Sequence, residues 1–471
     1  MKKSYLFGFI AMAALTISSC SNDEYVSNVR FDSPIEFGTY LGRDAQTRAS
    51  VITVNELATQ GFGVFAYYTD ESSYVNASTP ESGTKGEDGY VAAKIASPCN
   101  YMYNQFVSKS GDAWTYSPVK YWPNDPNDKL TFFAYAPYDD ADANNNESGY
   151  DNISFSVHTT TTETTTDGET TTTSTVMSGD PIITFNVNND VKKQQDLLIS
   201  TSATQNLTKN KAGVDGIYVD ENVSFTFNHA LSRIGFTVKA IVDEVEAGTT
   251  PKALDPNTTI VLREVVLCRS QASTKSAAVG SSIFYTSGTI NLNQQNKNAT
   301  VNGNYVQFNW ATKTGTQTFN LNNDDFAAQT DFGAIYDEQG FVINSTNSTS
   351  ANKLNTDDSY IMIIPQEFGN YDDDDQNNNA PLYVYVEYDV ITLDGAIGYD
   401  GANAAYADLK SKITNHISTP VSINFESGKA YSLNLQLGMT SVKVDASVTA
   451  WPTEVGSAVD VPKNTEPAAQ S

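Results

Sequence analysis

The residue whose type and position most clearly indicate chemistry is Cys20, a lone thiol at the end of an apolar segment. Lys2 and Lys3 give the chain a positive start, and residues 5–17 form a hydrophobic run. That run is shorter than the about 20 apolar residues that a membrane-spanning helix needs. A positive start, a short apolar core and small residues before the break are typical of a secretory signal peptide, so residues 1–19 are expected to be one.

The residues around this thiol predict its modification. The sequence Ile-Ser-Ser-Cys at 17–20 resembles a bacterial lipoprotein box, in which the cysteine becomes the lipidated first residue of the exported chain. An ordinary signal peptide followed by a chance cysteine is the alternative. Residues 21–24 (SNDE) also resemble the acidic tag that sends some Gram-negative lipoproteins to the outer face of the outer membrane. We therefore expect attachment to outer-membrane lipid through Cys20.

The remaining reactive side chains do not form a recognisable site. His158, His229 and His416 lie far apart without the clustered Cys or His ligands that zinc requires, and His229 is interpreted as a hydrogen-bonded structural residue in a turn. The acidic run at 371–379 offers oxygen ligands for calcium but lacks the alternating ligands and turn glycine of an EF-hand loop, which favours a solvated loop. No nucleophile elbow, phosphate-binding glycine loop or zinc-protease motif is present. The sequence thus predicts a protein that is not an enzyme and holds no metal or cofactor.

The net charge and the cysteine content further limit the functions and the cross-links that the chain can have. The net charge at pH 7 is −27, and residues 1–48 contribute none of it, because they hold five Lys and Arg against five Asp and Glu. Such an acidic surface repels a phosphate backbone, so nucleic-acid binding is excluded as a function. After Cys20 only Cys99 and Cys268 remain. Export permits them to pair, but their spacing in sequence does not establish that they do.

The elements that position these residues are predicted to be strands. Alternating apolar residues recur along the chain, which is the strand signal, in the segments 61–68, 223–227, 234–238, 382–390, 431–437 and 442–450. Phe132, Phe133 and Tyr135 are expected to fill and flank the first core. Helical periodicity is scarce, and residues 406–413 are the best short candidate. We therefore predict an all-β protein of packed antiparallel sheets.

Polar segments separate these strands. Residues 139–152 are rich in Asp and Asn, and residues 159–175 are mostly threonine, which fits either an extended hairpin or a disordered insertion. Residues 243–258 combine Glu, Gly, Thr and Pro without alternation. The domain boundary is predicted there, between residues 49–242 and residues 243–471.

Several segments, taken in order, resemble the fimbrillin family, the type V pilins of Gram-negative anaerobes. They are VKYWPNDPNDKLTFFAYAP (119–137), QQDLLIS (194–200), FTFNHALSRIGFTV (225–238), YIMIIPQ (360–366) and FESGKAYSLNLQLGMTSVKVDASVTAW (425–451). The resemblance implies two tandem transthyretin-like β-sandwich domains after a lipoprotein signal and a prosegment (20–48). It also implies a fimbrial subunit at the outer membrane and cell surface. The threonine insertion departs from the family pattern.

The resemblance further implies maturation by an arginine-specific protease. Arg30, Arg43 and Arg48 are the candidates, and Arg48 fits best because a polar segment surrounds it and the first core strand follows. Cleavage there makes Ala49 the new N-terminus. The expected partners are other fimbrial subunits through self-polymerisation. The alternative is a monomeric lipid-anchored adhesin or tip subunit that keeps Cys20 and binds host or microbial glycans; a secreted hydrolase is a third hypothesis.

The prosegment itself has a strand pattern. Val29, Phe31, Ile35, Phe37 and Leu41 share one parity, while Arg30, Asp32 and Glu36 share the other. This alternation predicts a strand laid along a groove with its apolar side inward, acting as a cap. Its removal is expected to open the groove for a neighbour's C-terminal tail, in which Val455, Val459 and Val461 share a parity.

Overall fold

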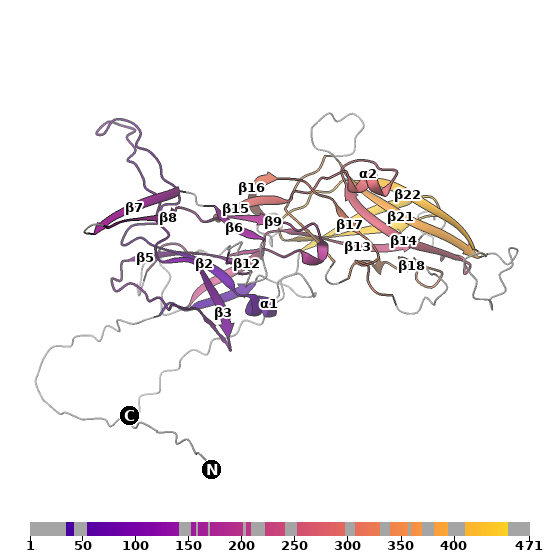
Figure 1. The fold of residues 1–471 in the computed structure, drawn as a ribbon, viewed down its shortest axis with the longest axis horizontal. Coiled ribbons are helices and arrows are strands. Elements are labelled where there is room, and N and C mark those ends of the chain that lie inside the picture. Colours follow the sequence, from indigo (N-terminus) through magenta and orange to yellow (C-terminus); the bar gives the residue numbers. More distant parts are fainter. Residues whose placement is uncertain are drawn as a thin grey trace, which may run out of the picture.

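The fold is almost entirely β-structure, as the sequence predicts (Figure 1). The computed structural model describes residues 34–41, 54–140, 152–156, 159–167, 170–200, 204–208, 222–240, 252–296, 307–329, 340–356, 359–369, 381–393 and 410–450. Within these ranges the helices are α1 (Val54–Gln60), α2 (Lys275–Val279) and the 3-10 turn η1 (Val191–Lys193). No helix in the described ranges is long and apolar enough to cross a membrane.

The largest sheet belongs to the N-terminal half of the chain. Its strands are β1 (Phe37–Leu41), β2 (Phe62–Tyr68), β3 (Met102–Ser110), β4 (Ala113–Thr115), β5 (Lys129–Ala136), β10 (Leu198–Ser200), β11 (Leu207–Thr208) and β12 (Val223–His229). They are ordered β1-β12-β10-β5-β2-β3-β4, and β11 also pairs with β5. Helix α1 lies beside this sheet and contributes Leu57 to its core.

Two five-stranded sheets form the C-terminal half. One contains β13 (Ser232–Ala240), β19 (Asn352–Lys353), β20 (Ile361–Ile363), β23 (Lys429–Leu437) and β24 (Val442–Ala450), with the main order β19-β13-β23-β24. The other contains β14 (Thr258–Cys268), β17 (Phe319–Leu321), β18 (Phe341–Ile343), β21 (Leu382–Leu393) and β22 (Lys410–Val421), with the main order β17-β14-β21-β22. Helix α2 packs on β14 and β21.

A smaller sheet joins the two halves. It consists of β6 (Ile153–Ser156), β9 (Ile182–Asn186), β15 (Ser287–Asn296) and β16 (Gln307–Thr314), in the order β16-β15-β9-β6. Strand β9 comes from the first half of the chain and pairs with β15 from the second. Because strands from both halves share hydrogen bonds here, the halves are connected by a continuous ladder as well as by the chain.

The chain changes sheets between β12 and β13. Strand β12 ends at His229 in the N-terminal sheet, and β13 begins at Ser232 and runs parallel to β23 in a C-terminal sheet. The change of sheet therefore precedes position 242, where composition places the domain boundary. That boundary stays a prediction, because part of the surrounding segment lies outside the described residues.

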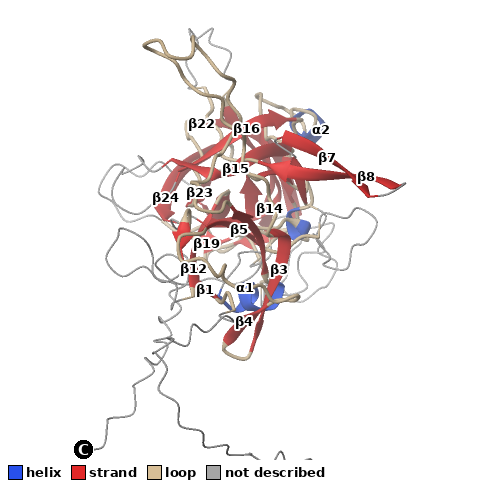
Figure 2. Cartoon of the chain, turned by 90° about the vertical axis from the view of Figure 1, so that its left-hand side faces the viewer, coloured by secondary structure: helices blue, strands red, loops and turns tan. Residues whose placement is uncertain are grey.

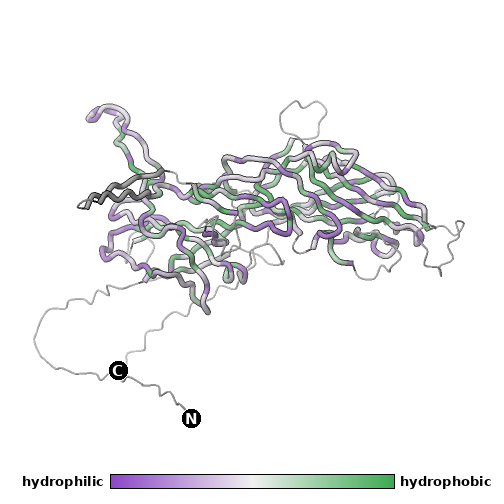
Figure 3. The backbone as a smooth tube through the Cα atoms, in the orientation of Figure 1, coloured by the Kyte–Doolittle hydropathy of each residue, from purple (hydrophilic) through white to green (hydrophobic). Residues whose placement is uncertain are grey.

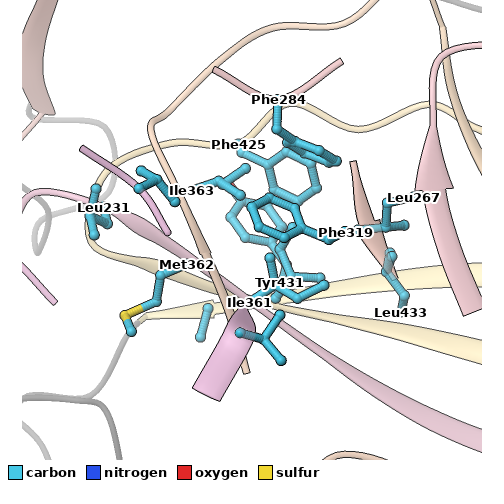
Figure 4. Packing of buried hydrophobic residues seen from close by; sticks show 14 of the residues in the cluster. Leu231, Leu267, Phe284, Phe319, Ile361, Met362, Ile363, Phe425, Tyr431 and Leu433 are labelled. Carbon is cyan, nitrogen blue, oxygen red and sulfur yellow. The ribbon is translucent and has the colours of Figure 1, made fainter. Parts of the chain in front are cut away.

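The main core runs through both halves. Figure 4 shows its C-terminal part, where Phe284, Phe319, Phe425 and Tyr431 pack against Leu433 and the aliphatic side chains of β20. A second core lies inside the N-terminal sheet and includes Phe62, Phe132 and Phe225. Along the tube in Figure 3 apolar colouring follows the strands and polar colouring gathers in the connections, as alternation with one or two buried faces requires.

These elements test several of the predictions made from the sequence. The predicted helix at 406–413 is wrong for its described part, since Lys410 to Ile413 lie in β22, which pairs with β21 along its whole length. The threonine-rich tract forms a hairpin, β7 (Thr159–Asp167) and β8 (Thr170–Ser178), which projects from the N-terminal half (Figure 1). Cys99 and Cys268 are both buried free thiols, so they do not pair. The acidic run at 371–379 lies outside the described residues.

Candidate assembly groove

Strand β1 places part of the expected prosegment inside the N-terminal sheet. It runs parallel to β12 over five residue pairs, from Phe37 opposite Val223 to Leu41 opposite Phe227. Its other side faces the end of the sheet that β4 forms, and β1 contacts β4. In the view turned by 90° from that of Figure 1, the labels of β1, β4 and α1 lie close together (Figure 2). Strand β1 is thus one terminal strand of this sheet, paired with β12 and in contact with β4, the terminal strand at the other end.

The side chains of this segment alternate as the sequence predicts. Ile35 and Phe37 are 1% and 2% exposed and belong to the N-terminal core, whereas Pro34 and Glu36 between and beside them are exposed. Each fully buried side chain of this size contributes about 1.5–3 kcal/mol, which for two gives about 3–6 kcal/mol as an upper estimate. The segment is therefore a part of the core and not a tether beside it.

Phe37 occupies a pocket built of aromatic rings. Its ring centroid lies 5.2 Å from that of Tyr116, 5.6 Å from that of Phe225, 6.1 Å from that of Phe132 and 6.3 Å from that of Phe62. The arrangement includes edge-on and stacked pairs, which are the favoured geometries of aromatic contacts. Four rings from four different parts of the chain thus enclose one side chain of the expected prosegment.

Backbone hydrogen bonds hold the same segment on both sides. The Val223 amide donates to the Glu36 carbonyl at 2.8 Å, and the Ile35 amide donates to the Lys120 carbonyl at 2.9 Å. The Tyr116 hydroxyl donates to the Ile35 carbonyl at 2.9 Å. Burial raises the pKa of Tyr116 to about 12, so this hydroxyl remains a donor at neutral pH.

Loss of β1 would expose the aromatic rings around Phe37 and the backbone groups of β12 that pair with β1. The aromatic pocket would open to water, and β12 would present an unpaired strand edge, which is a template for pairing with another chain. The groove is therefore defined by its core residues Phe62, Phe132 and Phe225, by Tyr116 at its wall and by the edge of β12.

The modification residues predicted from sequence lie outside the described residues. These are Cys20, Arg48 and Ala49, together with the other candidate arginines and the tail beyond Ala450. The structure accordingly neither brings them together nor separates them. The wall of the groove was not foreseen: Tyr116 and Trp114, which packs on Phe62 at 5.0 Å, come from a segment without long alternation, so no periodic signal marked them.

The two histidines within the described residues, His229 and His416, have structural surroundings, and His158 lies outside those residues. His229 is the last residue of β12 and not a turn residue, and its Nδ1 lies 2.7 Å from Oδ2 of Asp196, with both side chains buried. This confirms the expected hydrogen-bonded histidine. His416 on β22 lies 2.8 Å from the Tyr385 hydroxyl through Nδ1. In the described ranges, no three His, Cys, Asp or Glu side chains are arranged to hold a metal ion.

A polar cleft also lies on the C-terminal half. Its volume is about 520 Å³, and charged and amide side chains of β14, β21, β22, α2 and the 322–324 turn line it. At its floor Asp389 accepts from Arg263 Nε at 2.8 Å and from the Thr414 hydroxyl at 2.6 Å, and Lys412 Nζ lies 2.9 Å away. Burial alone would raise the pKa of Asp389, but these partners outweigh it and hold that pKa below its usual value.

Comparison with known proteins shows what the chain as a whole is similar to. No family model matches the chain. The chain is 24% identical over 468 residues to the fimbrium subunit Fim1C of Phocaeicola vulgatus, covering 96% of this chain and 98% of that protein. It shares its fold with the crystal structure of a fimbrial protein from Bacteroides vulgatus, with a TM-score of 0.55, 21% identity, and coverage of 89% of this chain and 99% of that one. The resemblance to the fimbrillin family that the ordered motifs carry is therefore confirmed, by similarity along nearly the whole chain and by a common fold.

Proposed function

We propose that this chain is a structural subunit of cell-surface fimbriae that supports adhesion. In this proposal it is exported as a lipoprotein through Cys20, cut after Arg48 by an arginine-specific protease and polymerised by donor-strand exchange. The similarity to a fimbrium subunit supports the general role. The finer steps are argued from the groove and from the sequence.

The single observation that carries the proposal is the position of β1. Ile35 and Phe37 are core residues of the N-terminal sheet, yet they precede Arg48 in the chain. A cut after Arg48 would leave this strand bound only by its contacts. An incoming strand that reproduces them replaces it without any change in the rest of the sheet, and the hydrogen-bonding edge of β12 supplies the ladder.

Attachment through Cys20 gives the precursor its place before assembly. Acyl chains bind membranes with about 0.8 kcal/mol per buried methylene, so a multiply acylated cysteine holds firmly. The cap then prevents assembly while the subunit is still in transit, because its groove is occupied. Loss of residues 20–48 removes anchor and cap in one step.

The N-terminal sequence of the protein on the cell surface tests this function. A chain beginning at Ala49 supports the proposal, and the Arg48→Ala variant should then retain the upstream segment. The Arg43→Ala variant is the matched control, and it should be processed normally. A surface chain that begins at Cys20 would contradict the proposal and indicate the lipid-anchored adhesin instead.

The lipid step has its own measurement. Cys20→Ala should abolish fatty-acid labelling of the precursor and leave it mislocalised. Cys99→Ala serves as the control, since that thiol is buried in the core and is expected to have no effect on labelling. Undiminished labelling of the Cys20→Ala precursor would show that the lipoprotein assignment is wrong.

A further inference from the structure

The groove holds a large aromatic side chain of β1 in a closely packed pocket. Phe37 is 2% exposed among four aromatic rings, and Ile35, two residues earlier on the same face, is 1% exposed. Glu36 between them points to solvent and is exposed. The occupant of the groove is thus recognised as an aliphatic residue, a polar residue and an aromatic residue in succession.

The chain's own tail does not offer that pattern. Residues 452–471 contain no aromatic residue, no leucine and no isoleucine. Their best match is Val459-Asp460-Val461, which repeats the apolar-polar-apolar order of Ile35-Glu36-Phe37 with valine at the aromatic position. A valine there leaves most of the volume of the Phe37 ring empty, and unfilled volume in a close-packed core is destabilising.

Trp451 does not remedy this mismatch. It follows Ala450, which is paired with Lys429 in the sheet of its own subunit. One residue of extended chain spans at most about 3.6 Å, so Trp451 cannot reach a neighbour's groove as a strand while β24 remains paired. The residues after it, 452–471, offer only valines as branched apolar side chains.

We propose that the groove accepts its donor strand from a different subunit, one whose tail carries an aromatic side chain at the position of Phe37. This inference rests on the proposed function, because it specifies the partner of the same groove. It departs from the self-polymerisation expected from the sequence: this chain's valine tail would enter the groove of a subunit other than itself. In the assembled fibre the contact at this groove would then join two unlike subunits, either in alternation along the fibre or where the two kinds of subunit meet.

Displacement of the natural cap from the full chain tests the proposal. The purified full-length protein is cut with an arginine-specific protease, and binding of a fluorescent peptide of residues 29–41 is followed as it exchanges with the retained cap. Unlabelled competitors are the peptide of residues 29–41, its Phe37→Val and Glu36→Gln variants, the tail peptide of residues 452–464 and its Val461→Phe variant. The Glu36→Gln peptide is the control, changed at an exposed position.

Phe37→Val should weaken competition by about 100-fold, which corresponds to about 2.8 kcal/mol at 1.4 kcal/mol per tenfold change. The native tail should compete as weakly as the Phe37→Val peptide, and Val461→Phe should recover a large part of the difference. Equal competition by the native tail and the 29–41 peptide would overturn the inference while leaving donor-strand exchange intact. If the labelled 29–41 peptide itself never binds, the groove does not exchange strands, and the proposed function fails together with the inference.

Discussion

At the scale of single residues, this protein depends on a few side chains that connect segments distant in sequence. Phe37 joins β1 to rings from three other strands and from the segment after β4. Asp389 similarly joins β14 to β22 through Arg263, Lys412 and Thr414. In each case one substitution removes several interactions, so its effect is measurable in the whole molecule.

Phe37→Ala in the uncut chain should lower the free energy of unfolding by about 3–5 kcal/mol, because it empties an aromatic pocket in the core. Denaturant unfolding of the full-length protein measures this. Glu36→Ala, one residue away on the exposed face, should change stability by less than about 0.5 kcal/mol. Equal effects of the two substitutions would mean that β1 is not held in the core in solution.

Asp389→Asn should lower the unfolding free energy at pH 7 by about 3 kcal/mol, because the nearly buried carboxylate balances two cations. The pKa of Asp389 is lower in the folded than in the unfolded chain. Its contribution is therefore complete above about pH 4 and is lost as the pH falls through the folded pKa.

The measurement is urea unfolding at neutral and acidic pH. The difference between wild type and Asp389→Asn should shrink on acidification. Asp445→Asn is the matched control, because that carboxylate also contacts a lysine but is half exposed. If the difference in unfolding free energy between wild type and Asp389→Asn stays constant down to the lowest pH, the stabilising role assigned to the Asp389 carboxylate is contradicted.

At the scale of elements, neighbouring residues of one strand serve different cores. On β5, Phe132 belongs to the N-terminal core while Phe133 and Tyr135 belong to the main core. On β21, Val384 faces the main core, whereas Tyr383 and Tyr385 pack beneath α2. Such strands are buried on both faces, which explains why their residues are apolar nearly throughout. The β7–β8 hairpin is the opposite case, since these two strands form a sheet of their own and β8 joins the rest of the described structure at its base, where Ser178 bridges to Pro98.

Replacing residues 162–175 by a two-residue Asn-Gly turn should leave the fold intact and the unfolding free energy within about 1 kcal/mol of wild type. The base of the hairpin is retained, because the Cys99 amide donates to the Met177 carbonyl at 2.7 Å. Thermal unfolding measures the effect. A cooperative loss of structure in the shortened protein would show that the hairpin supports the core.

At the scale of the whole molecule, the two halves share one core and one sheet but have separate roles in the proposed assembly. The N-terminal half carries the groove, and the C-terminal half carries the strand, β24, from which the tail departs. In the proposed assembly the subunit would accept a strand at one place and donate one from another, so a substitution could remove either function alone.

Deleting residues 452–471 should prevent donation, and Arg48→Ala should prevent acceptance. In cells, both changes should reduce the heat-resistant ladders that contain this chain on gels, whereas the Arg43→Ala chain should resemble wild type. Ladders of undiminished size from the tail deletion would exclude this donor segment. Monomers from correctly cut wild type, in the presence of its co-expressed subunits, would favour the adhesin hypothesis.

The sequence alone determined the all-β class, most strands and the inward face of the segment that holds Ile35 and Phe37. Period-2 alternation is local: it shows in Ile35, Glu36 and Phe37 before any partner is known, because successive side chains of a strand point to opposite faces. The signal-peptide pattern before Cys20 is equally local. Short helices such as α1 and the strand that includes residues 410–413 were missed or misassigned, because segments this short carry few periods.

Only the tertiary structure decided which strands pair. Strands β12 and β13 are separated by two residues and carry similar alternation, yet they lie in different sheets. Nothing in the residues of β1 indicates that β12 is its neighbour, or that Tyr116 closes the pocket around Phe37. Alternation specifies the face that a strand buries but not its partner. The partner depends on contacts between residues far apart in sequence, which exist only once the chain has folded.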